Sequence, residues 1–244
     1  MLFGYDSAYK SASRVSFSPL RKRSADPITA ATTAILKPEL VRHGFQDLSR
    51  RRFGRIKDDI LHYLDLQLSG YGGKRFCVNY AAISLYSPRE HIVLEPGARL
   101  AELPRREKWW PGDNHDSADH SMIEVVRLFE SIALAFFNKA ETTSGYLDIL
   151  ERKKGGSRHH LQFQLACVYA KLRREDAARN ALKLAVQLYR DDGRPWCAKC
   201  ISLCEQLLTA LDGGVAQALL ATWKEYSIQN LRLAALMSPP NRGL

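Results

Sequence analysis

The stretch Leu64-Asp65-Leu66-Gln67-Leu68-Ser69 alternates apolar and polar side chains, which is the two-residue period of a half-buried β-strand. Phe76, Val78 and Tyr80 repeat this period further along the chain. Between the two lies Gly70-Tyr71-Gly72-Gly73, which predicts a turn because glycine adopts positive φ without a steric penalty. We therefore expect an antiparallel hairpin, around which the rest of the fold is organised.

The residues before this hairpin predict a helix and a third strand. An apolar stripe at helical spacing is formed by Ile35, Leu36, Leu40, Val41 and Phe45. Asp26 or Thr29 can start this helix, and Gly44 can end it. The basic, interrupted segment 48–56 then leads into the sheet.

The residues after the hairpin predict irregular chain followed by a long helix. Four prolines between residues 86 and 119 argue against long regular elements there, although His91–Leu94 can form a short edge strand. Ser121 and Glu124 have the spacing of a capping box, which predicts a helix start. Apolar residues then continue at helical spacing to Phe137, and Tyr146–Leu150 predicts a shorter helix.

Short motifs occur in a fixed order along residues 33–152. They are Leu36-Lys37-Pro38, His43-Gly44-Phe45, Arg52-Phe53, the strand Leu64–Ser69, Phe76–Tyr80, Arg99-Leu100, Trp109-Trp110 and the long apolar helix. In this order they resemble the bacterial family catalogued as domain of unknown function 4304. The resemblance implies an α+β domain with an antiparallel sheet and no established catalytic residues, and some members are suspected of neutralising toxins. A basic leader and a helical extension depart from the family's pattern.

The extension from about Arg158 onward predicts only helices. Leu165-Ala166, Tyr169, Ala178, Leu182 and Ala185 fall on the spacing of one tetratricopeptide repeat, whose small residues let two helices approach closely. A second repeat is not supported, because 34 residues later the small positions hold Cys200, Asp212 and Leu219. Such a unit cannot cover its apolar face alone, so we expect it to pack on the first domain or on a partner.

The predicted fold class is therefore α+β, with an antiparallel sheet of three or more strands packed on helices. An all-α helical-hairpin extension resembling tetratricopeptide repeats follows it. We place a flexible basic leader at residues 1–27, the α+β domain at 28–154 and the extension at 155–244.

Composition narrows the classes of function. The net charge is +10, and its densest clusters are Arg21–Arg23 and Arg50–Arg52. Nucleic-acid binding is therefore a possible function, ranked third behind protein binding and enzymatic activity. Apolar runs stay below the roughly 18 residues that a membrane span requires, so no membrane partner is expected. Met1–Tyr9 does not read as a signal peptide, and the odd count of 5 cysteines is typical of reduced thiols. We expect a cytoplasmic protein.

Arg51, Arg52, Trp109 and Trp110 form the candidate partner-binding surface. Aromatic side chains bordered by arginines combine desolvated contact area with charge, and such residues dominate binding energy where they are exposed. The competing interpretation, which we favour, is that the tryptophans seal the core.

Two clusters could support catalysis. His115, Asp116, Asp119 and His120 offer four possible metal ligands within six residues, although a polar loop ahead of a helix explains them more simply. Cys197 and Cys200 have the spacing of a redox pair, but with Cys204 they share one helix face, which favours buried thiols.

The sequence favours a non-enzymatic protein-binding module of the bacterial cytosol, of immunity or adaptor type, without a cofactor. The alternative is a metal-dependent or thiol-redox enzyme that uses His115–His120 or Cys197 and Cys200. Because nuclease inhibitors commonly present acidic surfaces and this chain is basic, we expect that an inhibited toxin would not be a nuclease with an exposed basic cleft.

Overall fold

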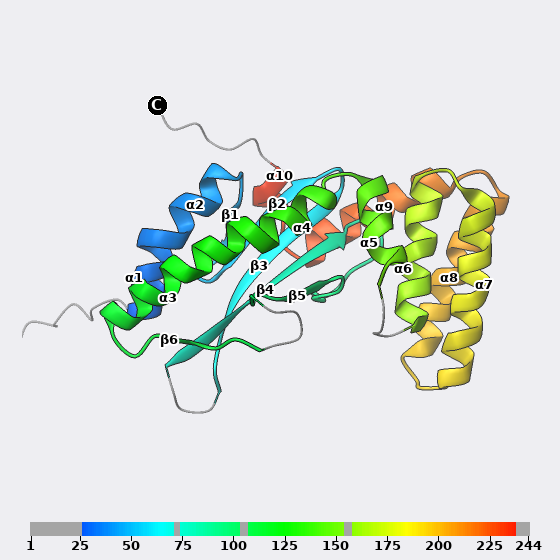
Figure 1. The fold of residues 1–244 in the computed structure, drawn as a ribbon. Helices are drawn as coiled ribbons and strands as arrows, with labels where there is room; N and C mark the ends of the chain where they lie inside the picture. Colours follow the sequence, from blue (N-terminus) through cyan, green and yellow to red (C-terminus); the bar gives the residue numbers. More distant parts are fainter. Residues whose placement is uncertain (1–25, 71–73, 103–106, 154–157, 238–244) are drawn as a thin grey trace, which may run out of the picture.

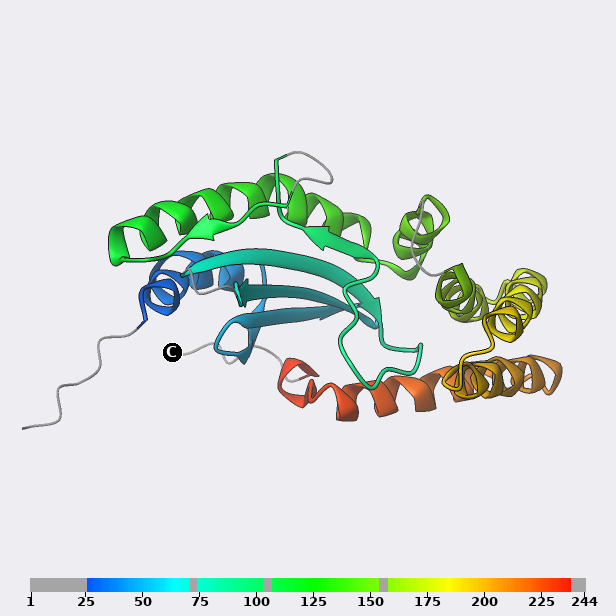
Figure 2. The ribbon, with the colours of Figure 1, turned by 90° about the horizontal axis from the view of Figure 1, so that it is seen from below.

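The computed structural model describes residues 26–70, 74–102, 107–153 and 158–237. The predicted leader at residues 1–27 lies almost entirely outside these ranges, as does most of the predicted turn at residues 70–73. Among the described residues, an antiparallel sheet lies between two layers of helix, and further helices extend beyond one end of the sheet (Figures 1 and 2).

The first helix confirms the predicted start and end. Asp26 caps it, because its carboxylate accepts a hydrogen bond from the Thr29 backbone N–H at 3.2 Å. The helix runs through α1 (Pro27–Ala31), the π-helical turn η1 (Thr32–Leu36) and α2 (Lys37–Arg42). It ends before Gly44, which has a φ of +79°.

The sheet has the order β1-β2-β3-β4-β5, and β6 pairs with β4 beside β5. Its strands are β1 (Gln46–Ser49), β2 (Arg52–Lys57), β3 (Ile60–Leu68), β4 (Arg75–Ser84), β5 (Gly97–Arg99) and β6 (Trp110–Pro111). The β3–β4 hairpin is the predicted one, with Leu64 opposite Tyr80 and Leu66 opposite Val78. Its alternation positions Leu64 and Leu66 in the core, whereas Leu68 is 40% exposed at the strand end.

Two predictions about the strands were incomplete or wrong. Residues 46–57 form two strands rather than one, because Arg50 and Arg51 make a tight turn between β1 and β2. The predicted edge strand at His91–Leu94 is wrong, since this segment makes no ladder and the edge strand β5 begins at Gly97. There the backbone of Gly97 lies so close to Tyr80 that an added Cβ would stand 2.3 Å from its carbonyl oxygen.

The long helix begins six residues before the predicted capping box. Asn114 caps α3 (His115–Leu128), with its side chain accepting from the Ser117 N–H at 2.8 Å and the Ser117 hydroxyl accepting from the Asn114 N–H at 3.2 Å. The helix continues through the π-helical turn η2 (Phe129–Ala133) and α4 (Leu134–Lys139). The capping box at Ser121 and Glu124 is wrong because both residues lie inside the helix. Ser121 donates to the Pro111 carbonyl, and Glu124 accepts from Trp110.

One face of the sheet packs against the first helix and the long helix. The core there joins Leu36 and Leu40 with Leu64, Val78 and other apolar residues of the strands and of α3. The opposite face packs against α9 (Ala216–Asn230) and α10 (Ala234–Met237), at the other end of the chain. Figure 2 shows the sheet between the green long helix and the orange and red C-terminal helices.

The remaining helices stack beyond the end of the sheet (Figure 1). They are α5 (Thr143–Glu151), which was predicted, and α6 (Arg158–Lys171), α7 (Glu175–Asp192) and α8 (Cys197–Asp212). Ile60, Ala82 and Tyr86 of the sheet region belong to the same apolar cluster as these helices. The expectation that the extension packs on the first domain is confirmed. None of the helices in the described ranges is long and apolar enough to cross a bilayer.

Candidate functional site

The tryptophan pair divides between core and surface. Trp110 in β6 is 1% exposed, stacks on Phe76 with ring centroids 5.8 Å apart, and donates its indole N–H to Glu124 at 2.9 Å. Trp109 is half-buried, with the Arg99 guanidinium 5.2 Å from its ring centroid. The structure therefore supports the core interpretation for Trp110, because a buried ring cannot meet a partner. Partner binding by Trp109 stays a prediction.

Arg51 and Arg52 are each paired within the fold. The Arg51 guanidinium donates to the Asp26 carboxylate at 2.8 Å and therefore braces the cap of the first helix. Arg52 Nε lies 3.4 Å from the Asp65 carboxylate on the neighbouring strand. Both arginines retain exposure, so their role toward a partner stays a prediction, but their internal ion pairs account for their presence.

His115, Asp116, Asp119 and His120 lie in the first turns of α3 rather than in a loop, and all four side chains are exposed. His120 Nδ1 lies 2.8 Å from the Asp116 carbonyl oxygen, so one possible ligand atom is directed at its own helix. Among the described residues, the ligand atoms of Glu39, His43 and Glu130 do converge.

The three cysteines of α8 share one helix face, as predicted. Cys197 and Cys204 are buried and Cys200 is half-buried. Burial raises the pKa of all three thiols. Since the thiolate is the reactive form, this environment disfavours the redox chemistry that the spacing suggested.

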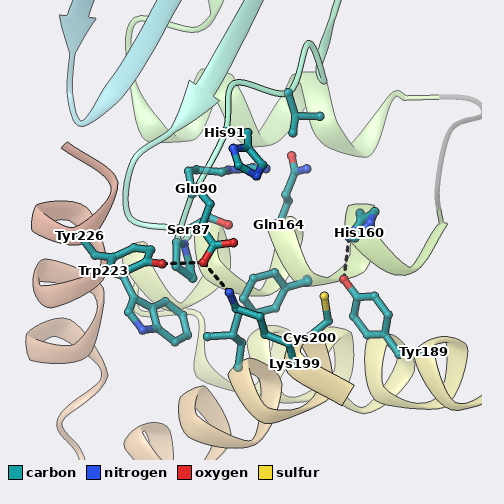
Figure 3. Close-up of a pocket in the computed structure, with 15 residues that line it drawn as sticks. Ser87, Glu90, His91, His160, Gln164, Tyr189, Lys199, Cys200, Trp223 and Tyr226 are labelled. Atoms are coloured by element: carbon teal, nitrogen blue, oxygen red, sulfur yellow. Dashed lines mark hydrogen bonds and ion pairs between the residues drawn. The ribbon is translucent and has the colours of Figure 1, made fainter. Parts of the chain in front are cut away.

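A pocket of about 420 Å³ opens where the extension meets the sheet. It lies between the segment after β4, residues 87–93, and helices α6 to α9 (Figure 3). Phe163, Leu203 and Trp223 supply apolar walls. Its volume and apolar lining with a few polar groups are typical of small-ligand sites. We therefore take this pocket as a candidate site.

The segment 87–93 is held in place by α9. The buried Ser227 hydroxyl accepts from the Arg89 backbone N–H at 3.1 Å, and it shares its own proton between the Trp223 carbonyl at 2.9 Å and the Ser87 carbonyl at 3.3 Å. At the exposed rim, Glu90 accepts hydrogen bonds from Lys199 and, at 2.8 Å, from the Tyr226 hydroxyl. These two bonds lower the pKa of Glu90, and Figure 3 shows them as dashed lines.

Arg89 is the most unusual group of the pocket. Its Nε and Nη2 atoms are buried, yet neither has a hydrogen-bond partner among the described residues. A guanidinium carries five donors, and a buried unpaired donor of a charged group is expensive. Arg89 therefore places positive charge beside the pocket, although side chains cover these two nitrogens.

The far wall of the pocket consists of three titratable side chains, His160, Tyr189 and Cys200. His160 Nδ1 lies 2.8 Å from the Tyr189 hydroxyl, and Tyr189 lies beside Cys200 (Figure 3). Burial, with His159 and Arg89 nearby, lowers the pKa of His160, while burial raises the pKa of Tyr189. At neutral pH this wall is uncharged.

Sequence reasoning missed this pocket. Its residues come from five segments that lie up to 139 positions apart, Ser87 and Tyr226 being the outermost. The segment Ser87-Pro88-Arg89-Glu90-His91 contains no periodicity or motif, so only its dense polar composition around Pro88 could have drawn notice.

Comparisons with known proteins bear on the first domain alone. No curated protein and no solved structure matches the chain. Residues 36–139 match the model of a family described as "Domain of unknown function (DUF4304)". The match spans α2, the whole sheet and the long helix, and it stops before α5. Residues 36–139 are therefore similar to the DUF4304 domain, and the helices from α5 onward lie outside this similarity.

Proposed function

We propose that the chain is a non-enzymatic binding module that holds a segment of another protein in the pocket between residues 87–93 and α6 to α9. The observation that supports it most is the pair of buried, unpaired Arg89 nitrogens beside the apolar walls of Phe163, Leu203 and Trp223. An adaptor or immunity protein of the bacterial cytosol is the type of protein that this activity and the resemblance to the family suggest.

The chemistry of the pocket indicates what it would take. A carboxylate can accept two parallel hydrogen bonds from a guanidinium, and one that enters the pocket would satisfy the Arg89 donors once the groups that cover Nε and Nη2 shift. The apolar walls would take the side chain next to that carboxylate. The last residue of a polypeptide carries both groups on one Cα, so we expect the ligand to be a partner's C-terminus with an apolar final residue.

The alternatives have less support. Burial raises the pKa of Cys200, which disfavours the thiolate that nucleophilic chemistry needs, and it lowers the pKa of His160, which makes that imidazole a weaker proton acceptor. Arg51 and Arg52, from the densest described basic cluster, are engaged in internal ion pairs, which weakens the case for nucleic acid. A pocket that receives a carboxylate is also consistent with a target other than a nuclease with an exposed basic cleft.

The helical extension supports the proposal through its packing. Ala166, Ala178 and Ala185 are fully buried between helices, as the small residues of a tetratricopeptide-like hairpin would be. Helical hairpins of this type commonly present grooves to partner segments. The repeat-like relationship remains part of the proposal.

A library of peptides with free C-termini tests this function. We expect selection of peptides with an apolar last residue, and a loss of affinity of at least tenfold when the terminus of a selected peptide is amidated. Arg89→Gln should cause a similar loss. Leu203→Trp, in α8, should block binding by filling the pocket. Leu219→Trp, in α9, is the matched control, since it fills a groove between α8 and α9 that lies outside the pocket.

Each variant is first checked for an unchanged melting temperature. Equal binding of amidated and free peptides, or full binding by Leu203→Trp, would contradict the proposal. So would a library that yields no ligand.

A further inference from the structure

Three side chains from the two helices on one face of the sheet converge outside the pocket. Glu39 lies in α2, His43 is the first residue after α2, and Glu130 lies in η2 of the long helix. One ligand atom of each lies within 4.8 Å of the other two. All three residues lie within the stretch that is similar to the DUF4304 domain, far from residues 87–93 in the sequence.

Helix geometry explains the convergence. Glu39 and His43 are four residues apart, which brings their side chains to the same face of a helix. Glu130 is in a π-helical turn, and the helix that leads to Glu39 also contains one, at Thr32–Leu36. Such turns widen a helix locally, redirect its side chains and occur frequently at functional sites.

Glu39 is the reason to expect a ligand here. It is a carboxylate with only 6% exposure, and its Oε1 atom is buried without a hydrogen bond from any described residue. His43 Nε2 lies 3.2 Å from this oxygen, but the two atoms are not aligned as donor and acceptor. The other oxygen, Oε2, is paired with Arg42. A buried carboxylate oxygen that lacks a hydrogen-bond donor is costly, and a cation would satisfy it.

The geometry points to a divalent transition-metal ion, of the Zn²⁺ or Mn²⁺ type, held by Glu39, His43 and Glu130. Metal–ligand bonds of about 2.1 Å place neighbouring ligand atoms roughly 3.0–3.4 Å apart. The 3.2 Å between Glu39 Oε1 and His43 Nε2 lies in this range. One imidazole and two carboxylates suit borderline divalent ions of the first transition row.

The surroundings hold the imidazole and leave the third ligand adjustable. The His43 ring packs edge-on against Phe129, with centroids 5.7 Å apart. The backbone carbonyl oxygen of His43 accepts a hydrogen bond from Arg55 at 2.8 Å. Glu130 is exposed, so its carboxylate can rotate toward the ion. Arg42 has 70% side-chain exposure and can swing into solvent when the ion neutralises Glu39. A bound ion would link the first helix to the long helix.

Titration of Zn²⁺ and Mn²⁺ into tag-free, chelator-stripped full-length protein tests this site by calorimetry. We expect one ion per chain for at least one of the two metals, with a weaker response to Mg²⁺ and Ca²⁺. Glu130→Gln and His43→Ala should each reduce the affinity at least tenfold. The matched control is the Asp116→Asn, His120→Ala double variant, which removes an exposed Asp and His from the same long helix and should bind as the unmodified chain does.

Thermal melts give a second measurement. Saturating metal should raise the melting temperature of the unmodified chain and of the control, but not that of Glu130→Gln, whose exposed position makes misfolding no concern. The inference is overturned by absence of binding, or by equal affinity in the unmodified chain and both ligand variants. Because peptide binding in the pocket is measured separately, either proposal can fail without the other.

Discussion

The two ends of the β3–β4 hairpin have one core face in common but differ on the opposite face. Near the extension, Leu61, Tyr63 and Ile83 bury that second face against Leu233 and Leu236. At the far end the same face carries Asp65, Gln67 and Asn79, and the Asn79 amide donates to Gln67 at 3.3 Å. Apart from the buried Cys77, the apolar residues of this face stop where the C-terminal helices stop. The side chains of the sheet are therefore suited to helices that follow about 150 residues later in the sequence. The C-terminal helices of the extension form one layer of the folded domain.

The largest expected effect comes from a cavity at the covered end of the hairpin, which is the end that packs against the C-terminal helices. Ile83→Ala removes a side chain with no exposed surface and leaves a cavity between sheet and helix, which should lower the free energy of unfolding by about 3 kcal/mol. Gln67→Ala, on the same face at the polar end, should change it by less than about 0.5 kcal/mol. Urea denaturation of both variants checks the contrast, and equal effects would mean that the two ends do not differ.

A second test uses pH at the covered end. His62 is fully buried, its Nδ1 accepts from Arg55 at 3.0 Å, and its Nε2 lies 3.1 Å from the Ala140 carbonyl. Burial, with Arg55 and Lys57 nearby, lowers the pKa of His62 to about 4. Between that value and the ordinary 6.5 the unfolded chain binds a proton that the folded chain does not, so stability falls as the pH falls.

Lowering the pH from 7 to 4.5 should therefore remove about 2 kcal/mol through His62. Urea denaturation at both pH values measures the loss, and His62→Gln should lose less than the unmodified chain by that amount. Identical pH dependence in the two proteins would show that His62 takes up its proton while folded.

A smaller effect than these two is expected at the turn between β2 and β3, where Asp59 pairs with lysines of the extension. The Asp59 carboxylate accepts from Lys171 at 2.8 Å and pairs with Lys224 at 2.6 Å. Burial opposes ionisation of Asp59, but these two partners outweigh it and lower its pKa. Asp59→Asn tolerates the local φ of 62° and should cost about 1 kcal/mol.

Asp65→Asn provides the comparison at the polar end, where the carboxylate lies 3.4 Å from Arg52, and should cost less than about 0.5 kcal/mol. Thermal unfolding of the two variants ranks them. A larger effect for Asp65 would reverse the proposed importance of the two ends.

Local chemistry made much of the fold predictable. The alternation at Leu64–Gln67, the cap at Asp26 and the glycine that ends the first helix each depend on a few neighbouring residues, and each is as predicted. The start of the long helix was misplaced because Ser121 and Glu124 imitate a capping box, whereas Asn114 pairs with Ser117 and not with the Glu or Gln usual at that position.

The candidate sites depend on distant segments and were not predictable in the same way. Arg89 stands out only because two of its nitrogens lack hydrogen-bond partners, and this becomes visible only when α6 to α9 are packed around it. Glu39 and His43 have a helical spacing visible in the sequence, but their third partner is 87 positions beyond His43, in the long helix. The predicted sites at Trp109 and His115–His120 rest on local composition, which shows residue types but not their burial, and they stay predictions.

The central claim is that the extension and the sheet unfold as one unit, and the 4 tryptophans allow it to be measured directly. In the Trp196→Phe, Trp223→Phe variant the remaining fluorescence reports on the sheet, and in the Trp109→Phe, Trp110→Phe variant it reports on the extension. In each variant we predict that the urea midpoint by fluorescence coincides with the midpoint by far-ultraviolet circular dichroism, which reports on the whole chain. A fluorescence transition of the extension at clearly lower urea than the transition of the whole chain would contradict the account.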